Sequence, residues 1–192
     1  MTIDRRRFAA LLAASAAASA GKAGARQSFR VGEVVEGAEI EGREASWYRK
    51  LEEGRVECEL CPQACTVADA ERGACGAREN RGGTYYTLVH SLACSVHADP
   101  IEKKPFFHVM PGELALSWAT AGCNVECKFC QNWEISQFRP EQVRSIHLPP
   151  EALVEMARRA SAKLVAATYS EPVIFWEYVR DTARAARKAG LA

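Results

Sequence analysis

The feature that most constrains this chain is the spacing of its eight cysteines. Three of them, Cys123, Cys127 and Cys130, form a C-x3-C-x2-C loop that contains no fourth cysteine. Three thiolates at this spacing can ligate three irons of a 4Fe-4S cluster and leave the fourth iron open. An open metal position distinguishes a reactive site from a structural one. A structural zinc ion would need a further ligand from outside the loop, such as His108 or Cys94.

The second group is Cys58, Cys61, Cys65 and Cys75, with turn-forming proline and glycine residues between its members. Four ligands predict a closed, structural metal site that holds a small module together. Zinc and an iron–sulfur cluster are equal alternatives here, because thiolates bind both. Disulfides are a third alternative if the protein is exported. The remaining Cys94 is expected to be a small buried side chain.

The sequence divides into four segments. Residues 1–20 are a candidate signal segment, and residues 21–46 are a linker. Residues 47–112 form a cysteine-rich module whose short strand-like runs carry too little apolar content for burial alone to stabilise it. From residue 113 to residue 192 the pattern becomes that of alternating strands and helices.

Two short apolar runs, LALSWAT at 114–120 and LVAAT at 164–168, lack polar alternation. Such runs are typical of strands buried on both faces of a parallel sheet. Pro150 opens a predicted helix between them, with Leu153 and Ala157 on its buried face. The order of strand, helix, strand and helix predicts an α/β fold with right-handed crossovers.

A second helix is predicted to begin at Pro172 and to end at Gly190. Its buried face would carry Ile174, Tyr178, Thr182, Ala185 and Ala189. Its solvent face would carry Glu177, Arg180, Asp181, Arg184 and Arg187. Two parallel strands cannot close a barrel, so the chain is expected to be a C-terminally truncated piece of a longer protein.

A polar turn follows the second apolar run, where residues 168–172 read TYSEP. Active sites of parallel α/β folds gather at the carboxyl ends of the strands, which makes this turn a candidate part of the site. The alternative is that Ser170 and Glu171 only cap the helix opened by Pro172.

Several segments together suggest a family. They are CELCPQAC, RGACGARENRGGTYYTLVHS, DPIEKKPFFHVMPG, TAGCNVECKFCQNWEIS and TYSEPVIFWEYV. From about residue 47 to residue 192, the chain resembles the radical S-adenosylmethionine (SAM) enzymes of the AmmeMemoRadiSam system, relatives of the pyruvate formate-lyase activating enzymes. The resemblance implies the first two βα units of a partial (β/α)6 barrel, preceded by the cysteine-rich module.

By the same resemblance, Cys123, Cys127 and Cys130 would ligate a 4Fe-4S cluster whose open iron chelates SAM. Reductive cleavage of SAM would give methionine and a 5′-deoxyadenosyl radical that abstracts hydrogen from an unidentified substrate. A low-potential electron donor is then required, and a protein substrate is one option by analogy. The competing interpretation is an iron–sulfur or zinc module for binding or electron transfer, without catalysis.

The resemblance also assigns cofactor-binding residues. Phe129 would pack beside the adenine of SAM, with filling of the barrel mouth as the alternative. Glu171 matches the glutamate of the superfamily's Gly-Gly-Glu stretch, and Thr168 and Ser170 lie in the same turn; here Tyr169 and Ser170 replace the two glycines. The next residues after Cys130 in the loop, Asn132 and Trp133, are candidate neighbours of the cluster.

The amino terminus predicts export. A twin arginine at Arg5 and Arg6 precedes an alanine-rich run that ends in a small-residue cleavage pattern at 18–20, which is typical of a Tat signal. The alternative is an alanine-rich helical start in a cytoplasmic protein. The run is too short and too weakly apolar to predict a membrane span.

The formal net charge of the whole chain is +1, which gives no electrostatic reason to expect a nucleic-acid partner.

Overall fold

The structure is a computed structural model that describes residues 29–37 and 40–192. The signal segment at 1–20 and the first part of the linker lie outside the described residues, so export to the periplasm stays a prediction. Within the described ranges, no helix combines the length and the apolar character needed to cross a bilayer.

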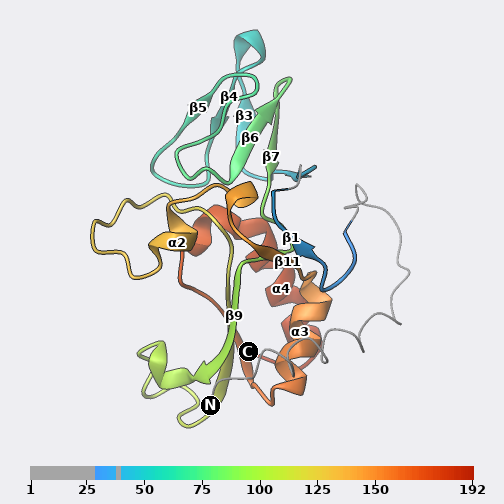
Figure 1. The fold of residues 1–192 in the computed structure, drawn as a ribbon, viewed down its shortest axis with the longest axis vertical. Helices are drawn as coiled ribbons and strands as arrows, with labels where there is room; N and C mark the ends of the chain where they lie inside the picture. The colour runs from blue at the N-terminus through green and yellow to red at the C-terminus, as the bar shows by residue number, and fades with distance from the viewer. Residues whose placement is uncertain (1–28, 38–39) are drawn as a thin grey trace.

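The centre of the fold is a three-stranded sheet in the order β12-β10-β9. Strand β10 (Leu114–Ala119) runs parallel to β12 (Leu164–Ala167), with Leu116 opposite Val165. Both apolar runs are therefore strands, and their predicted parallel pairing is confirmed. On its other side β10 pairs antiparallel with β9 (Ser95–Pro100), the long strand at the middle of Figure 1.

Two helices follow the order expected from the sequence. Helix α3 (Pro150–Arg159) leads into β12, and it packs against α4 (Trp176–Lys188), which follows β12. The helix predicted from Pro172 begins as a separate turn of 3-10 helix, η4 (Pro172–Phe175). The main apolar core lies between the sheet and these helices; its buried members include Leu116, Trp118, Leu148, Leu153, Ala157, Ile174, Phe175 and Tyr178.

The cysteine-rich part contains two small antiparallel sheets, which lie at the upper end of Figure 1. One sheet has the order β3-β4-β5 and the other has the order β2-β7-β6. Their strands are β2 (Arg43–Glu44), β3 (Tyr48–Lys50), β4 (Val56–Cys58), β5 (Thr66–Val67), β6 (Arg78–Arg81) and β7 (Thr84–Thr87). The buried apolar cluster of this part holds only Ala45, Val56, Cys58, Val67 and Tyr85.

Short elements connect these parts, and among them β1, β11 and β8 form a third antiparallel sheet. The connecting elements are β1 (Val34–Val35), η1 (Glu52–Gly54), β8 (Leu92–Ala93), η2 (Ile101–Lys103), α2 (Trp133–Ser136), η3 (Pro140–Gln142) and β11 (Ser145–His147).

The prediction that Glu177 points to solvent is wrong. Its side chain is 1% exposed and forms a bidentate ion pair with the equally buried Arg78 of β6. Arg78 also donates to the Ile174 carbonyl at 3.1 Å, and Glu177 accepts the Ser46 N–H at 2.8 Å. Glu177 lies three residues after buried Ile174, which places both on one face of the helical segment.

Burial acts to raise the pKa of Glu177, but the Arg78 charge and the hydrogen bonds outweigh it and hold that pKa below its ordinary value. Asp181 is not free in solvent either, because it pairs with Arg43 at 2.6 Å and with His90 at 3.3 Å. The Arg78–Glu177 and Arg43–Asp181 ion pairs and the His90–Asp181 hydrogen bond join the cysteine-rich part to α4.

We predict that Glu177→Gln destabilises the protein by about 3–5 kcal/mol, since it leaves the Arg78 charge buried without its counterion. Urea unfolding at neutral pH measures the change. The matched control is Glu155→Gln, which removes a more exposed ion pair with Arg159 and should cost less than about 1 kcal/mol. Equal effects of the two substitutions would contradict the role assigned to the buried pair.

Candidate functional site

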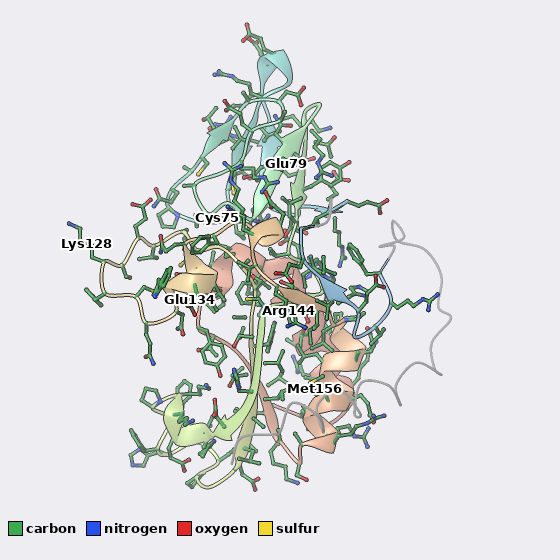
Figure 2. The ribbon with its side chains drawn as sticks, viewed as in Figure 1. Cys75, Glu79, Lys128, Glu134, Arg144 and Met156 are labelled. Atoms are coloured by element: carbon green, nitrogen blue, oxygen red, sulfur yellow. The ribbon has the colours of Figure 1, made fainter. Side chains whose placement is uncertain are left out.

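The candidate site lies at the carboxyl ends of β10 and β12. The chain leaves β10 into a loop in which Cys123 and Cys130 are half-buried and Cys127 is exposed. The Cys130 N–H donates to the Cys127 carbonyl at 3.1 Å, which closes a tight turn around Lys128. Figure 2 shows Lys128 at the outer end of the loop, away from the body of the fold. The Cys130 sulfur lies 3.3 Å from the Ser136 hydroxyl.

All eight cysteines are free thiols, so the disulfide alternative is not formed in the structure. Across residues 29–37 and 40–192, no three Cys, His, Asp or Glu side chains are placed so that they could hold a metal ion together. The loop nevertheless supplies the donor set that an iron–sulfur cluster requires, three thiols with solvent access and cluster-type spacing. Binding a cluster would require these thiols to turn toward one another.

The turn at 168–171 lies beside this loop, as the sequence predicted for the ends of two parallel strands. The Thr168 N–H donates to the Trp118 carbonyl at 3.0 Å, which continues the β10–β12 pairing. Buried Ser170 donates its hydroxyl proton to the Thr120 carbonyl at 2.9 Å. The backbone at the start of the cysteine loop is therefore fixed to the turn.

A second link joins the far end of the loop to the same turn. The Asn132 side chain donates to the Tyr169 carbonyl at 2.9 Å. Tyr169 has a φ of 69°, in the left-handed region that glycine favours. By the resemblance given above, it stands where the wider superfamily usually has a glycine, so the backbone keeps a glycine-like conformation at a cost of about 1–3 kcal/mol.

The structure also places the candidate cofactor residues Glu171 and Phe129. Glu171 accepts the Val173 N–H at 3.3 Å, so it caps η4 as the alternative interpretation proposed. Phe129 is 91% exposed and does not fill the barrel mouth. Trp133 lies against Phe138, with 6.0 Å between the ring centroids.

Sequence reasoning did not predict that Tyr169 lies in a polar cluster with Asp99, although both residues come from segments that it singled out, TYSEP and DPIEKKPFFHVMPG. The Tyr169 hydroxyl donates to Asp99 at 3.0 Å, and the Lys104 ammonium lies 4.8 Å from the centroid of its ring. Burial raises the pKa of Tyr169 to about 12. Burial acts to raise the pKa of Asp99 as well, but Lys103, Tyr169 and Lys104 together hold that pKa below its usual value. The tyrosine therefore stays protonated beside an ionised carboxylate.

The four cysteines of the second group come together around one cavity. Cys58, Cys61, Cys65 and Cys75 line it with Tyr85, Asn124, Gly73 and other residues, and its volume is about 10 Å³. Figure 2 shows Cys75 where the upper part of the molecule meets the rest of the fold. The Gln63 amide donates to the Asn124 carbonyl at 3.2 Å, so the cavity lies next to the loop that begins at Cys123.

Comparison with known proteins supports the interpretation of the site. Residues 119–191 match the family model of the Radical SAM superfamily. This match supports membership of that superfamily for the matched segment. The superfamily typically uses a 4Fe-4S cluster and SAM, and the matched segment includes both the three-cysteine loop and the turn at 168–171.

Two curated proteins of Methanocaldococcus jannaschii are similar to the chain. Uncharacterized protein MJ0808 is 42% identical over 149 residues, which cover 78% of this chain and 45% of the relative. Uncharacterized protein MJ0674 is 30% identical over 102 residues, which cover 53% of this chain and 25% of the relative. The chain thus spans less than half of either relative, and no solved structure matches it.

We predict that alkylation of the native protein at about pH 8 modifies Cys127 at least ~100-fold faster than Cys94. Cys127 is exposed, whereas burial raises the pKa of Cys94 to about 12 and its thiol donates to the Ala119 carbonyl. Mass spectrometry of peptides after timed iodoacetamide treatment measures both rates. Similar rates for the two thiols would contradict the described exposure of the loop.

Proposed function

We propose that this chain belongs to a radical SAM enzyme in which Cys123, Cys127 and Cys130 hold a 4Fe-4S cluster with one open iron. The observation that carries the proposal is the position of the three-cysteine loop. It follows a buried parallel strand and is hydrogen-bonded at both ends to the turn after the neighbouring strand. A simple metal-binding module has no need for this attachment to a second strand end.

When bound, the cluster would supply an electron that cleaves SAM into methionine and a 5′-deoxyadenosyl radical. The task of the protein is then to position the sulfonium and to exclude water. Thr168, Ser170 and Glu171 lie on the turn nearest the loop and would orient the methionyl part of SAM. Phe129 is free to close over the adenine, because its side chain packs against little else.

Two hydrogen bonds would maintain this geometry. Ser170 fixes the turn to the Thr120 carbonyl, and Asn132 fixes the Tyr169 carbonyl from the other end of the loop. Both donors act on backbone atoms, so these two hydrogen bonds set the distance between the loop and the turn. Asn132 is therefore a positioning residue in this proposal.

The finer identity rests on the resemblance to the AmmeMemoRadiSam system enzymes. We propose that the radical abstracts hydrogen from a substrate that the described residues do not identify, with a protein substrate as one option by analogy. The electron would come from a separate low-potential donor.

The direct test is formation of 5′-deoxyadenosine from SAM. Anaerobically reconstituted and chemically reduced protein should form it, and Cys127→Ala should lower the yield at least ~100-fold because one iron ligand is lost. Liquid chromatography with mass spectrometry quantifies the product. The matched control is Cys94→Ala, which lies outside both cysteine groups and should keep the yield of the unmodified protein. No product from iron-loaded, reduced protein would contradict the proposal.

Asn132→Ala should lower the rate of 5′-deoxyadenosine formation by about tenfold with unchanged iron content, because the loop and the turn lose one hydrogen bond that aligns them. Asn132→Asp keeps the size of the side chain but removes its NH2 donor, so its rate of 5′-deoxyadenosine formation should be no higher than that of Asn132→Ala. Full activity of the Asn132→Asp variant would show that shape alone matters at this position.

A further inference from the structure

The cavity between the four cysteines of the second group has features that the proposed SAM chemistry does not use. Cys58 comes from the end of β4, Cys61 and Cys65 come from the turn that follows, and Cys75 precedes β6. Four thiols from three segments of the chain thus surround one small space. If these thiols were only small apolar side chains packed together, they would need no polar groups around them.

A backbone donor is directed at one of these sulfurs. Cys65 accepts the Ala74 N–H at 3.4 Å. An N–H donor stabilises a thiolate far more than a thiol, because hydrogen bonds to ionised acceptors are the stronger ones.

A buried hydroxyl lies at the same cavity. Tyr85 is 0% exposed, and within the described residues its hydroxyl has no hydrogen-bond partner. A Cβ atom on Gly73 would lie 2.6 Å from this hydroxyl and 3.7 Å from the Cys65 sulfur, so only a glycine leaves room for both groups here. An unpaired buried hydroxyl is costly, and a thiolate is the acceptor that the cavity can offer it.

The size of the cavity limits what can bind. Its volume of about 10 Å³ suits one atom of the size of a water molecule. A single tetrahedral ion fits this space with smaller side-chain movements than a cluster of four irons and four sulfides would require. Zinc takes four thiolates at about 2.3 Å in closed structural sites.

We propose that Cys58, Cys61, Cys65 and Cys75 bind one divalent metal ion of the zinc class in a closed tetrathiolate site. Rotation of the side chains about their Cα–Cβ bonds turns the four sulfurs into the shared cavity. The ion replaces four thiol protons, which are released to solvent, and no electron is transferred. The bound ion supplies the stabilisation that the five-residue apolar cluster of this part cannot supply alone.

The site also contacts the loop of the proposed function. Gly122, with a φ of 90°, lies so close to the Cys75 carbonyl that a Cβ atom would be 2.4 Å from that oxygen. Gln63, between two of the proposed ligands, donates to the Asn124 carbonyl. A bound ion would therefore fix the backbone on both sides of Cys123 without itself meeting SAM.

Metal analysis of the full chain, purified anaerobically without added iron, tests the site. We expect about one zinc ion per chain in the unmodified protein and in Cys127→Ser. Cys61→Ser and Cys65→Ser should each lose at least ~90% of it. In the unmodified protein, Co(II) exchanged into the site should show the intense visible absorption of a tetrahedral thiolate complex. This spectrum keeps the test valid if a cysteine variant fails to fold.

Each other outcome overturns the proposal. Retention of zinc in both Cys61→Ser and Cys65→Ser would place the ion elsewhere. Iron and sulfide bound to a variant that lacks Cys123, Cys127 and Cys130 would assign a cluster to the second group. Four thiols that react only after reduction would indicate disulfides. Because none of these measurements uses SAM, failure of the zinc site and failure of the radical chemistry are separate results.

Discussion

The rest of the structure depends on the buried ion pair between Arg78 and Glu177. Both side chains are 1% exposed, and the pair joins β6 of the cysteine-rich part to α4 of the α/β part. A buried ion pair contributes little net stability compared with apolar packing, but the loss of one partner is very costly. The Arg78–Glu177 pair therefore favours one placement of the cysteine-rich part against the α/β part. A placement that separates the two side chains but keeps one of them buried leaves that charge without a partner.

That placement decides where the cysteines lie. Arg78 and Ile174 both line the cavity of the second cysteine group, so the ion pair and the four thiols share one junction. From this junction the Cys75 carbonyl packs on Gly122, at the entrance of the loop that carries Cys123. The cysteine-rich part thus supports the loop at the carboxyl end of β10, and the two cysteine groups belong to one continuous piece of structure.

Sequence reasoning predicted the elements of the fold that local sequence signals determine. The runs at 114–120 and 164–168 are apolar without alternation, which is typical of strands covered on both faces, although three of the four residues of β12 are only half-buried. Pro150 marks the start of α3 because its missing N–H costs nothing in a first helical turn. The order of these elements then leaves few alternatives to parallel pairing.

Sequence reasoning missed the features that depend on contacts between residues far apart in the sequence. Glu177 resembles a solvent-facing helix residue until Arg78, 99 positions away, is placed beside it. The antiparallel pairing of β9 has no signal in its mixed polar sequence. The link from Asn132 to the Tyr169 carbonyl depends on a main-chain atom, and a side-chain motif cannot reveal it.

The central claim is that one iron of the cluster at Cys123, Cys127 and Cys130 has no protein ligand and binds SAM. Electron–nuclear double resonance of the reduced protein, with SAM labelled by ¹⁵N at the methionyl amine and ¹³C at the carboxylate, tests it most directly. The account predicts that both labels couple to the cluster and that SAM changes its resonance spectrum. An unchanged spectrum with no coupling to either label would contradict the account.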